Sequence, residues 1–336
     1  MNIYMISPNP IWGGAATANI AIAQMLSKEH TVFYNDEYFN LSIEGVVYDN
    51  YPTHQSKNSH QLVEHLQSKK IDVVIWGVAM AIPYYRKAAR LLHKQGIKQV
   101  ALFHSLAIVN SFKGRMMEKF IALSLKHIDD LVFVSKYTDI SWSEKYRTIR
   151  KHPHHHVIYN PIFVEKKNKI KTTCHRIGFV GRFSEEKQPE LFAQLSVNDE
   201  VNKYIAWGDG PLLSDLIDKY PKVDFKGQSS NQKEIYDSID ILVMTSQFEN
   251  CPMVILEAWK YGIPCVAPNV GGIPEIVKHG HNGMLYNEYS LEAINSCIDQ
   301  IQSDYNIYSA NCSEGIMKYS YERLYNEWYE LLNNER

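Results

Sequence analysis

The stretch from residue 241 to 276 constrains the fold more than any other part of the chain. Two apolar runs, 241–244 and 263–267, are short enough for buried strands, and the segment between them has the length and composition of a helix. Gly271 and Gly272 then open a further helical segment. Strand, helix, strand and helix in succession form the repeating unit of a parallel sheet, so we predict an α/β fold.

The first of these helices is expected to have Pro252 in its first turn, because a missing N–H costs nothing there. Asn250 or Cys251 would be the N-cap, and Gly262 would end the helix. Both helices then start beyond the carboxyl ends of neighbouring strands. Free N–H groups and positive dipole ends at that edge favour an anion such as a diphosphate.

Two carboxylates frame the first helix, Glu249 just before it and Glu257 within it. Phosphate oxygens repel carboxylates, whereas sugar hydroxyls donate to them. Acids beside an anion site therefore predict a ligand that carries both phosphate and sugar. The alternative is that Glu249 is a solvated loop residue and that Glu257 pairs with Lys260 or Tyr261 on its own helix.

The first 160 residues alternate between short apolar runs and helical patterns, as in a doubly wound sheet. The expected strands are residues 2–7, 31–34, 46–48, 72–76, 99–104 and 131–134, and the expected helices are 15–26, 58–70, 83–95, 112–128 and 136–146. Gly13 and Gly14 form the first strand-to-helix turn, which would admit a ligand close to the backbone or would simply be a tight turn. The absence of a GxGxxG pattern disfavours a nicotinamide dinucleotide.

Polar groups end several expected strands in both halves of the chain. His104 stands where it would bind a phosphate or a sugar hydroxyl, or else cap or pack a helix. Arg182 and Lys187 follow the first strand of a second sheet, where they would neutralise a diphosphate unless they pair with the neighbouring glutamates. The turn from Gly208 to Pro211 would carry a nucleobase or only redirect the chain.

A polar, Lys-rich segment at 165–173 is the expected boundary between two domains of ordinary size. We assign residues 1–162 to the first domain and residues 163–316 to the second. Residues 317–336 are aromatic and helical in pattern, so they need a large apolar partner and are expected to pack back on the first domain. Two domains connected in this way would form a hinged cleft.

Composition is that of a soluble globular protein, with 45% hydrophobic and 21% charged residues. The chain has no run of about 18 apolar residues, no signal-peptide pattern and five cysteines without a CxxC pair, so we expect a cytoplasmic protein with reduced thiols. Residues 1–160 hold 18 Lys and Arg against 12 Asp and Glu, whereas residues 161–336 hold 17 against 25. The basic first half suggests contact with an anionic surface or acceptor.

Two segments of the basic half are candidate binding sites. Residues 112–128 mix four cations with apolar residues, and they would lie on a membrane surface or form an ordinary amphipathic helix on the sheet. Four histidines, at 152 and 154–156, precede the strand-like run 157–160. No carboxylate or thiol stands beside them in the sequence, so we expect no metal there.

Four motifs occur in the order and spacing of the retaining glycosyltransferases of family 4, which have the GT-B fold: GRFSEEK (181–187), GDGP (208–211), FENCPMVILEA (248–258) and GGIPEIV (271–277). The chain also resembles that family at Gly13-Gly14, FHS around His104, VSKYT (134–138), VIYNP (157–161) and the terminal helix. The resemblance covers nearly the whole chain. It implies two doubly wound Rossmann-like domains facing across a cleft, the first for an acceptor and the second for a nucleotide sugar, with the last helix crossing back to the first domain.

The resemblance also implies roles for individual residues. Arg182 and Lys187 would hold the donor diphosphate, Glu249 would contact the transferred sugar, and His104 would lie near the reacting sugar, so these four are the expected catalytic residues. The expected donor-binding residues are Gly13, Gly14, Gly181, Gly208, Asp209, Gly210, Asn250, Cys251, Met253, Val254 and Glu257, the last accepting from the ribose hydroxyls. Many members have glycine at the position of Asn250, and this departure bears on sugar specificity, not on the reaction class.

The resemblance implies a retaining hexosyltransferase that moves a hexose or N-acetylhexosamine from a nucleotide diphosphate sugar, with uridine favoured as the base. The acceptor would be a glycan or lipid-linked glycan of a lipopolysaccharide, capsule or other surface polysaccharide, and the first domain would touch the inner face of the plasma membrane. No cofactor, metal or nucleic-acid partner is expected. The alternatives are a sugar-nucleotide epimerase or phosphorylase on the same fold, and a non-catalytic nucleotide-sugar-binding protein.

Overall fold

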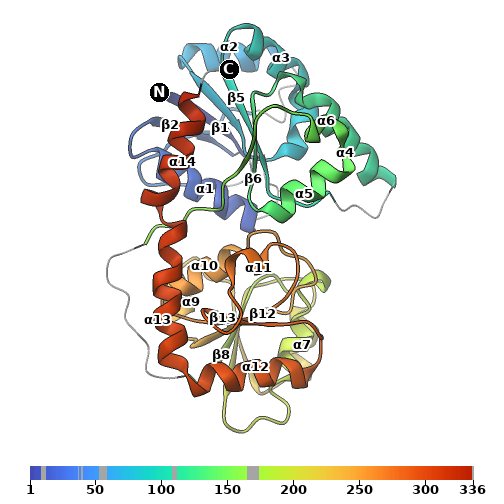
Figure 1. Cartoon of the computed structure of the whole chain (residues 1–336), viewed down its shortest axis with the longest axis vertical. Coiled ribbons are helices and arrows are strands. Elements are labelled where there is room, and N and C mark those ends of the chain that lie inside the picture. The colour runs from blue at the N-terminus through green and yellow to red at the C-terminus, as the bar shows by residue number, and fades with distance from the viewer. Residues whose placement is uncertain are drawn as a thin grey trace. The chain divides into compact units, whose positions relative to one another are not determined.

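The chain forms two units, which we describe one at a time from a computed structural model (Figure 1). Unit 1 comprises residues 1–163 together with 321–336, and unit 2 comprises residues 164–320. The structure describes residues 1–8, 13–36, 38, 41–52, 59–107, 112–164 and 174–334, without the side chains of residues 112 and 113. The expected linker at 165–173 lies outside these ranges.

Unit 1 contains a parallel seven-stranded sheet with the strand order β3-β2-β1-β4-β5-β6-β7. Its strands are β1 (Asn2–Ile6), β2 (Thr31–Asn35), β3 (Val47–Asp49), β4 (Val73–Trp76), β5 (Lys98–Phe103), β6 (Asp130–Phe133) and β7 (His155–Val157). The expected strand at 157–160 is wrong, because the pairing of His155 and His156 with Leu131 and Val132 places the histidines in the edge strand itself. The remaining strands were all predicted from their apolar runs.

Helices connect these strands, as the helical periodicity of the sequence predicts. They are α1 (Gly14–Leu26), α2 (Ser59–Ser68), α3 (Arg86–Lys94), α4 (Phe112–Ser124), α5 (Lys136–Lys145) and α6 (Arg147–Arg150), with 3₁₀ turns η1 (Ala79–Tyr85) and η2 (Leu125–His127). None of the helices within the described ranges combines the length and apolar character needed to cross a membrane.

The last helix, α14 (Tyr321–Asn333), belongs to unit 1 although unit 2 precedes it in the chain. Its apolar face buries Leu324 and Trp328, and the Tyr321 hydroxyl donates to Gln24 of α1 at 3.2 Å. At its far end, Lys98 of β5 donates to the backbone oxygens of residues 331 and 334. The expectation that this helix packs on the first domain is confirmed.

Unit 2 contains a parallel six-stranded sheet with the order β10-β9-β8-β11-β12-β13. Its strands are β8 (Arg176–Val180), β9 (Lys203–Trp207), β10 (Val223–Gly227), β11 (Ile241–Val243), β12 (Cys265–Pro268) and β13 (Gly283–Tyr286). Its helices are α7 (Pro189–Gln194), α8 (Leu213–Lys219), α9 (Gln232–Asp237), α10 (Met253–Lys260), α11 (Ile273–Ile276), α12 (Leu291–Ser303) and α13 (Tyr305–Gly315), with 3₁₀ turns η3 (Glu185–Lys187) and η4 (Ile316–Tyr319). Both units are therefore doubly wound, Rossmann-like domains, as predicted.

The strand order of unit 2 reverses between β8 and β11. From β8 the chain builds outward through β9 and β10, and then it returns to the other side of β8 to build β11, β12 and β13. At such a reversal the loops after the two central strands diverge, and ligands of open α/β sheets bind at the carboxyl ends of the strands there. The same reversal occurs in unit 1 between β1 and β4.

Candidate functional site

The loops after β8 and β9 pack on each other through glycines. A Cβ at Gly208 would lie 1.9 Å from the backbone oxygen of Gly181, and one at Gly210 would lie 2.5 Å from that of Phe183. The Phe183 N–H donates to Asp209 O at 3.0 Å, which joins the two loops. Only glycine permits this approach, so these glycines form a close-packed layer at the carboxyl edge of the sheet.

An ion pair spans the switch point of unit 2. The Lys187 Nζ lies 2.6 Å from Glu249 Oε1, with the side chains 28% and 11% exposed. Lys187 ends η3 after β8 and Glu249 lies in the loop after β11, so the pair bridges the two central strands. Within the described residues, Lys187 does not form the alternative ion pair with Glu185 or Glu186. The exposed Arg182 likewise makes no ion pair with the part of the chain that is described.

Thr245, which sequence reasoning missed, holds the turn that presents Lys187. Its buried hydroxyl lies 2.7 Å from Lys187 O and 2.8 Å from Gln188 O. Gln188 has φ of 45°, a left-handed conformation that is uncommon for residues other than glycine. The position of Thr245 directly after the apolar run of β11 was the available signal, because groups at strand ends reach the ligand edge.

The Gly-Gly turn after β12 supports the backbone of Glu249. The Gly272 N–H donates to Glu249 O at 3.0 Å. Gly271 has φ of 60°, and a Cβ there would lie 1.8 Å from the same oxygen. The GGIPEIV segment (271–277) after β12 therefore holds the FENCPMVILEA segment (248–258) after β11 in place.

Two helices begin at this edge, α10 after β11 and α11 after β12. The expected N-cap of α10, Asn250 or Cys251, is wrong: the cap is Pro252, whose ψ of 116° keeps it extended while its carbonyl accepts from Ile255 N at 3.3 Å. Met253 therefore opens the first turn. Neither helix has a side-chain cap bond in the described structure. At the start of α11, however, the N–H groups of Gly272, Ile273 and Glu275 donate to backbone oxygens, and Pro274 has no N–H. The expected anion-binding helix start is therefore retained for α10 and not for the short α11.

Glu257 of α10 has a partner that its own helix does not supply. It accepts a hydrogen bond of 2.7 Å from the Tyr236 hydroxyl of α9, a partner that the alternative pairing with Lys260 or Tyr261 did not include. Burial raises the pKa of Glu257, although the Tyr236 bond and Lys260 act in the opposite direction. Twenty-one positions separate the partners, which is why no local pattern could reveal the contact.

In unit 1, His104 joins a buried amide network. Its Nε2 lies 2.8 Å from Asn19 Oδ1, while the Asn19 amide donates to Ser7 Oγ at 2.8 Å and to Gly77 O at 2.9 Å. Because the amide nitrogen of Asn19 is committed to two acceptors, its oxygen faces His104, and we assign the proton to Nε2. Burial lowers the pKa of His104 to about 4, so the ring is neutral at pH 7.

Gly13 and Gly14 leave the start of α1 open. Gly13 is the N-cap in an extended conformation without a side-chain cap bond, and both glycines are exposed. A Cβ at either would meet no described atom within 4 Å. Packing within the described residues therefore does not require glycine here, in contrast to Gly208 and Gly271.

We expect the low pKa of His104 to make unit 1 less stable in mild acid. Above pH 6.5 the ring is neutral in both the folded and unfolded states, and as the pH falls toward 4 only the unfolded chain takes the proton. The free energy of unfolding should fall over this window by at most about 3 kcal/mol from this group. Urea denaturation at pH 7 and pH 5 should show that the free energy of unfolding falls less for His104→Gln than for the wild type. An equal fall in both proteins would contradict the lowered pKa of His104.

Part of the chain matches the model of a known family. Residues 162–318 match the model of the family described as glycosyl transferases group 1. This match covers nearly all of unit 2, including the four motif loops. The matched residues make up less than half of the 336-residue chain.

Individual relatives match over part of their length. The chain is 34% identical over 111 residues to the GDP-mannose-dependent alpha-mannosyltransferase of Corynebacterium glutamicum, which is 32% of this chain and 27% of that protein. It is 27% identical over 170 residues to the UDP-Gal:alpha-D-GlcNAc-diphosphoundecaprenol alpha-1,3-galactosyltransferase of Escherichia coli, which is 46% of this chain and 43% of that protein. The chain thus spans less than half of either relative.

The fold as a whole matches a solved structure. The complex of HepE from Anabaena with UDP-glucose superposes with a TM-score of 0.80 over 99% of both chains, at 17% sequence identity. At this identity the likeness establishes the fold alone. It extends over both units, whereas the family model covers residues 162–318 only.

Proposed function

We propose that this chain is a retaining glycosyltransferase that transfers a hexose or N-acetylhexosamine from a nucleotide diphosphate sugar, preferably a UDP-sugar. The observation that carries the proposal is the Lys187–Glu249 pair at the switch point of unit 2, where the loop that holds Glu249 leads into α10. This edge combines a cation and the N-terminus of α10 for phosphate with a carboxylate for sugar hydroxyls. The family match over residues 162–318 supports the same reaction class.

Charge explains how such an edge would promote transfer. Cleavage of the bond between sugar and diphosphate leaves a partly cationic sugar and increases the negative charge on the departing phosphate. Lys187, Arg182 and the N-terminus of α10 would stabilise that growing charge more in the transition state than in the ground state. In a retaining reaction the leaving phosphate can itself take the acceptor proton on the same face, so no general base is required from the protein.

Glu257 would bind the ribose of the donor. Its carboxylate is held by Tyr236 on one side and can accept hydroxyl donors with its remaining lone pairs. A uridine, guanosine or adenosine diphosphate would present the same ribose hydroxyls, so Glu257 accounts for nucleotide binding without selecting the base. We favour uridine because the Escherichia coli relative is named for UDP-Gal and the superposed Anabaena protein holds UDP-glucose.

Calorimetry and product analysis test the proposal together. We expect UDP to bind the wild type, and Glu257→Ala to weaken its binding by about 10-fold or more, because hydrogen bonds to a carboxylate contribute about 1.5–3 kcal/mol. Glu292→Ala, at an exposed glutamate of α12, is the matched control and should bind as the wild type does. UDP that binds equally well to both variants would place the ribose elsewhere.

Turnover separates transfer from the alternatives. With a panel of UDP-, GDP- and ADP-sugars, a transferase releases the nucleotide diphosphate only when a suitable acceptor is present. Conversion of the donor to its epimer without an acceptor would indicate an epimerase, and dependence on free phosphate would indicate a phosphorylase. Binding of a nucleotide sugar without turnover of any acceptor would favour a binding protein.

We further propose that unit 1 presents a lipid-linked acceptor from an anionic membrane surface through α4. This helix turns Ile121 and Ala122 into the core, yet its other side exposes Phe120 by 51% and Leu123 by 60%. Arg115 and Lys119 of α4 and Lys126 of the following turn η2 are exposed. Both sequence-based interpretations of residues 112–128 thus have support, because the helix packs on unit 1 and still has a second apolar side with cations beside it.

Vesicle sedimentation tests the membrane proposal. The wild type should sediment with phosphatidylglycerol vesicles at low salt and much less at high salt or with phosphatidylcholine. The double variant Phe120→Ser/Leu123→Ser should lose most of this binding. Ile307→Ser, on α13 of unit 2, removes a residue that is also 60% exposed and should bind normally. No wild-type binding at low salt would reject the proposal.

A further inference from the structure

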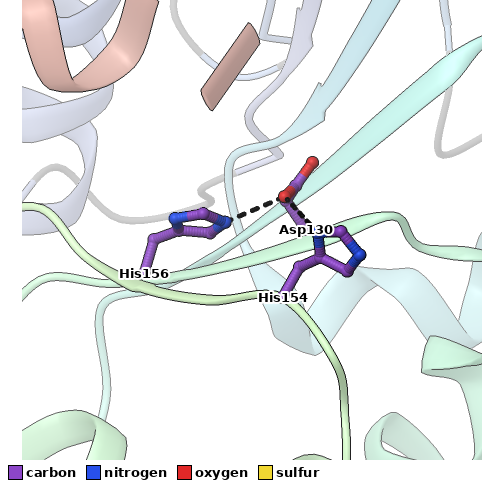
Figure 2. Close-up of side chains that lie close together, drawn as sticks. All are labelled: Asp130, His154 and His156. Carbon is purple, nitrogen blue, oxygen red and sulfur yellow. Dashed lines mark hydrogen bonds and ion pairs between the residues drawn. The ribbon is translucent and has the colours of Figure 1, made fainter. Parts of the chain in front are cut away.

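The edge of the unit 1 sheet brings together three potential metal ligands (Figure 2). His154 directly precedes β7 and His156 lies within it, and residues two positions apart in an extended segment place their side chains on the same side. Asp130 begins the neighbouring strand β6, and the backbone bond from Leu131 N to His154 O at 3.0 Å holds the segments in register. None of these three residues takes part in the proposed transfer site.

The distances among the three ligand atoms suit a small tetrahedral site. Asp130 Oδ1 lies 2.9 Å from His156 Nε2 and 3.7 Å from His154 Nδ1, and all three atoms lie within 4.8 Å of one another. Bonds of about 2.0–2.2 Å from zinc to nitrogen and oxygen imply ligand separations of about 3.3 Å in a tetrahedron. The observed separations bracket this value, so small side-chain rotations would close the site around an ion.

The sequence-based expectation that this histidine segment binds no metal rested on the lack of a neighbouring carboxylate, and the structure corrects that premise. Asp130 is 24 positions from His154 in sequence and reaches it through the pairing of β6 with β7. The other two histidines of the segment are engaged elsewhere: His152 Nε2 lies 3.1 Å from Ile128 O, and the ring of His155 contacts Ile149 O and Asp139. The fold therefore selects two of the four histidines.

The surroundings of Asp130 resemble the outer shell of a metal site. The Asp130 side chain is 3% exposed, and its second oxygen lies 3.2 Å from Lys98 Nζ, which also donates to the backbone at the end of α14. Ligating carboxylates are commonly held by a hydrogen-bonding partner of this kind. The side chains of His154 and His156 are 37% and 27% exposed, which gives an ion a route from solvent.

We propose that Asp130, His154 and His156 bind a zinc-like transition-metal ion, with water in the fourth position, and that this ion ties β7 to β6. Two imidazoles and one carboxylate match the ligand preference of zinc and its neighbours, whereas magnesium and calcium prefer oxygen ligands throughout. The proposed ion supports unit 1 and takes no part in transfer. The expectation that the reaction itself needs no metal stays a prediction.

Metal titration of the full chain tests the site. The chain should be purified without a polyhistidine tag, stripped with a chelator and titrated with Zn²⁺ by calorimetry at pH 7.5. We expect one equivalent to bind and the melting temperature to rise. His154→Ala and His156→Ala should each weaken binding by at least tenfold, because losing even an outer-shell partner typically costs about 10- to 100-fold. His281→Ala, at an exposed histidine of unit 2, controls for histidine number and should bind as the wild type does.

A second measurement does not depend on the variants. Co²⁺ bound to the wild type in place of Zn²⁺ should give the visible absorption of a tetrahedral nitrogen–oxygen site, and added Zn²⁺ should abolish it. The proposal is overturned if the wild type takes up no stoichiometric Zn²⁺, or if His154→Ala/His156→Ala binds it as tightly as the wild type does. Either result would leave the three residues as an ion pair network without a metal.

Discussion

Lys187→Met is expected to lower the turnover number for transfer by about 100- to 1,000-fold, the effect typical of removing one preorganised group that stabilises transition-state charge. The physical reason is specific to this structure. Lys187 is held 2.6 Å from Glu249 at the switch point, so the ammonium is already positioned where the departing phosphate would lie. Its removal takes away that cation and also leaves the carboxylate of Glu249 uncompensated beside the phosphate.

The double variant Lys187→Met/Glu249→Gln separates these two effects. If Lys187 only neutralised Glu249, removing both charges would restore transfer, and the two substitutions would be strongly non-additive. If Lys187 holds phosphate and Glu249 binds sugar hydroxyls, the double variant should be at least as slow as either single variant. Initial rates at saturating donor, measured for all four proteins, distinguish these results.

Lys222→Met is the matched control for this series. Lys222 forms an ion pair with Glu200 at the same distance of 2.6 Å in unit 2, but both partners are well exposed and neither follows β8 or β11. We expect its substitution to leave the rate unchanged, since exposed pairs contribute little. A Lys187→Met enzyme with a wild-type rate would remove Lys187 from the mechanism.

Gly271→Ala should have the largest effect on stability, a loss of about 3 kcal/mol or more in the free energy of unfolding of unit 2. Its φ of 60° strains any side chain, and the new Cβ would lie 1.8 Å from Glu249 O. The backbone must shift to relieve that contact, and the shift would displace Glu249 itself. Transfer should therefore fall together with stability.

Gly280→Ala provides the control that separates strain from contact. Gly280 has a comparable φ of 72°, but a Cβ there would meet no described atom within 4 Å. This variant should lose about 1 kcal/mol, the cost of the left-handed conformation alone. The difference between the two variants in the free energy of unfolding, measured by urea denaturation, gives the contribution of the clash. If both variants lose the same free energy, the contact with Glu249 O is relieved at no cost.

The sequence predicted the elements well because they depend on local patterns. The apolar run that begins at Ile241 forms β11, and the run that begins at Ile263 leads into β12. Gly262, with φ of 69°, follows the end of α10 as expected. The local errors of prediction concern the backbone conformation of single residues and the start of one strand. Pro252 stays extended instead of entering the helix, and β7 begins at His155 because its partner strand fixes the register there.

The contacts that define the site were less accessible to sequence reasoning. The motif positions of Lys187 and Glu249 were identified, but their mutual ion pair follows from the adjacency of β8 and β11, which only the sheet order specifies. Likewise, Tyr236 and Asp130 reach their partners across 21 and 24 positions. No periodicity or spacing records such pairs, because they arise from tertiary packing.

The discontinuity of unit 1 has a consequence for how the protein is made. During synthesis, the first sheet emerges from the ribosome long before α14, so the surface that Trp328 covers stays bare while unit 2 is translated. Unit 2 is continuous and can reach its native state first. Messenger truncation or proteolysis just before Tyr321 would therefore leave unit 2 intact and unit 1 prone to aggregate.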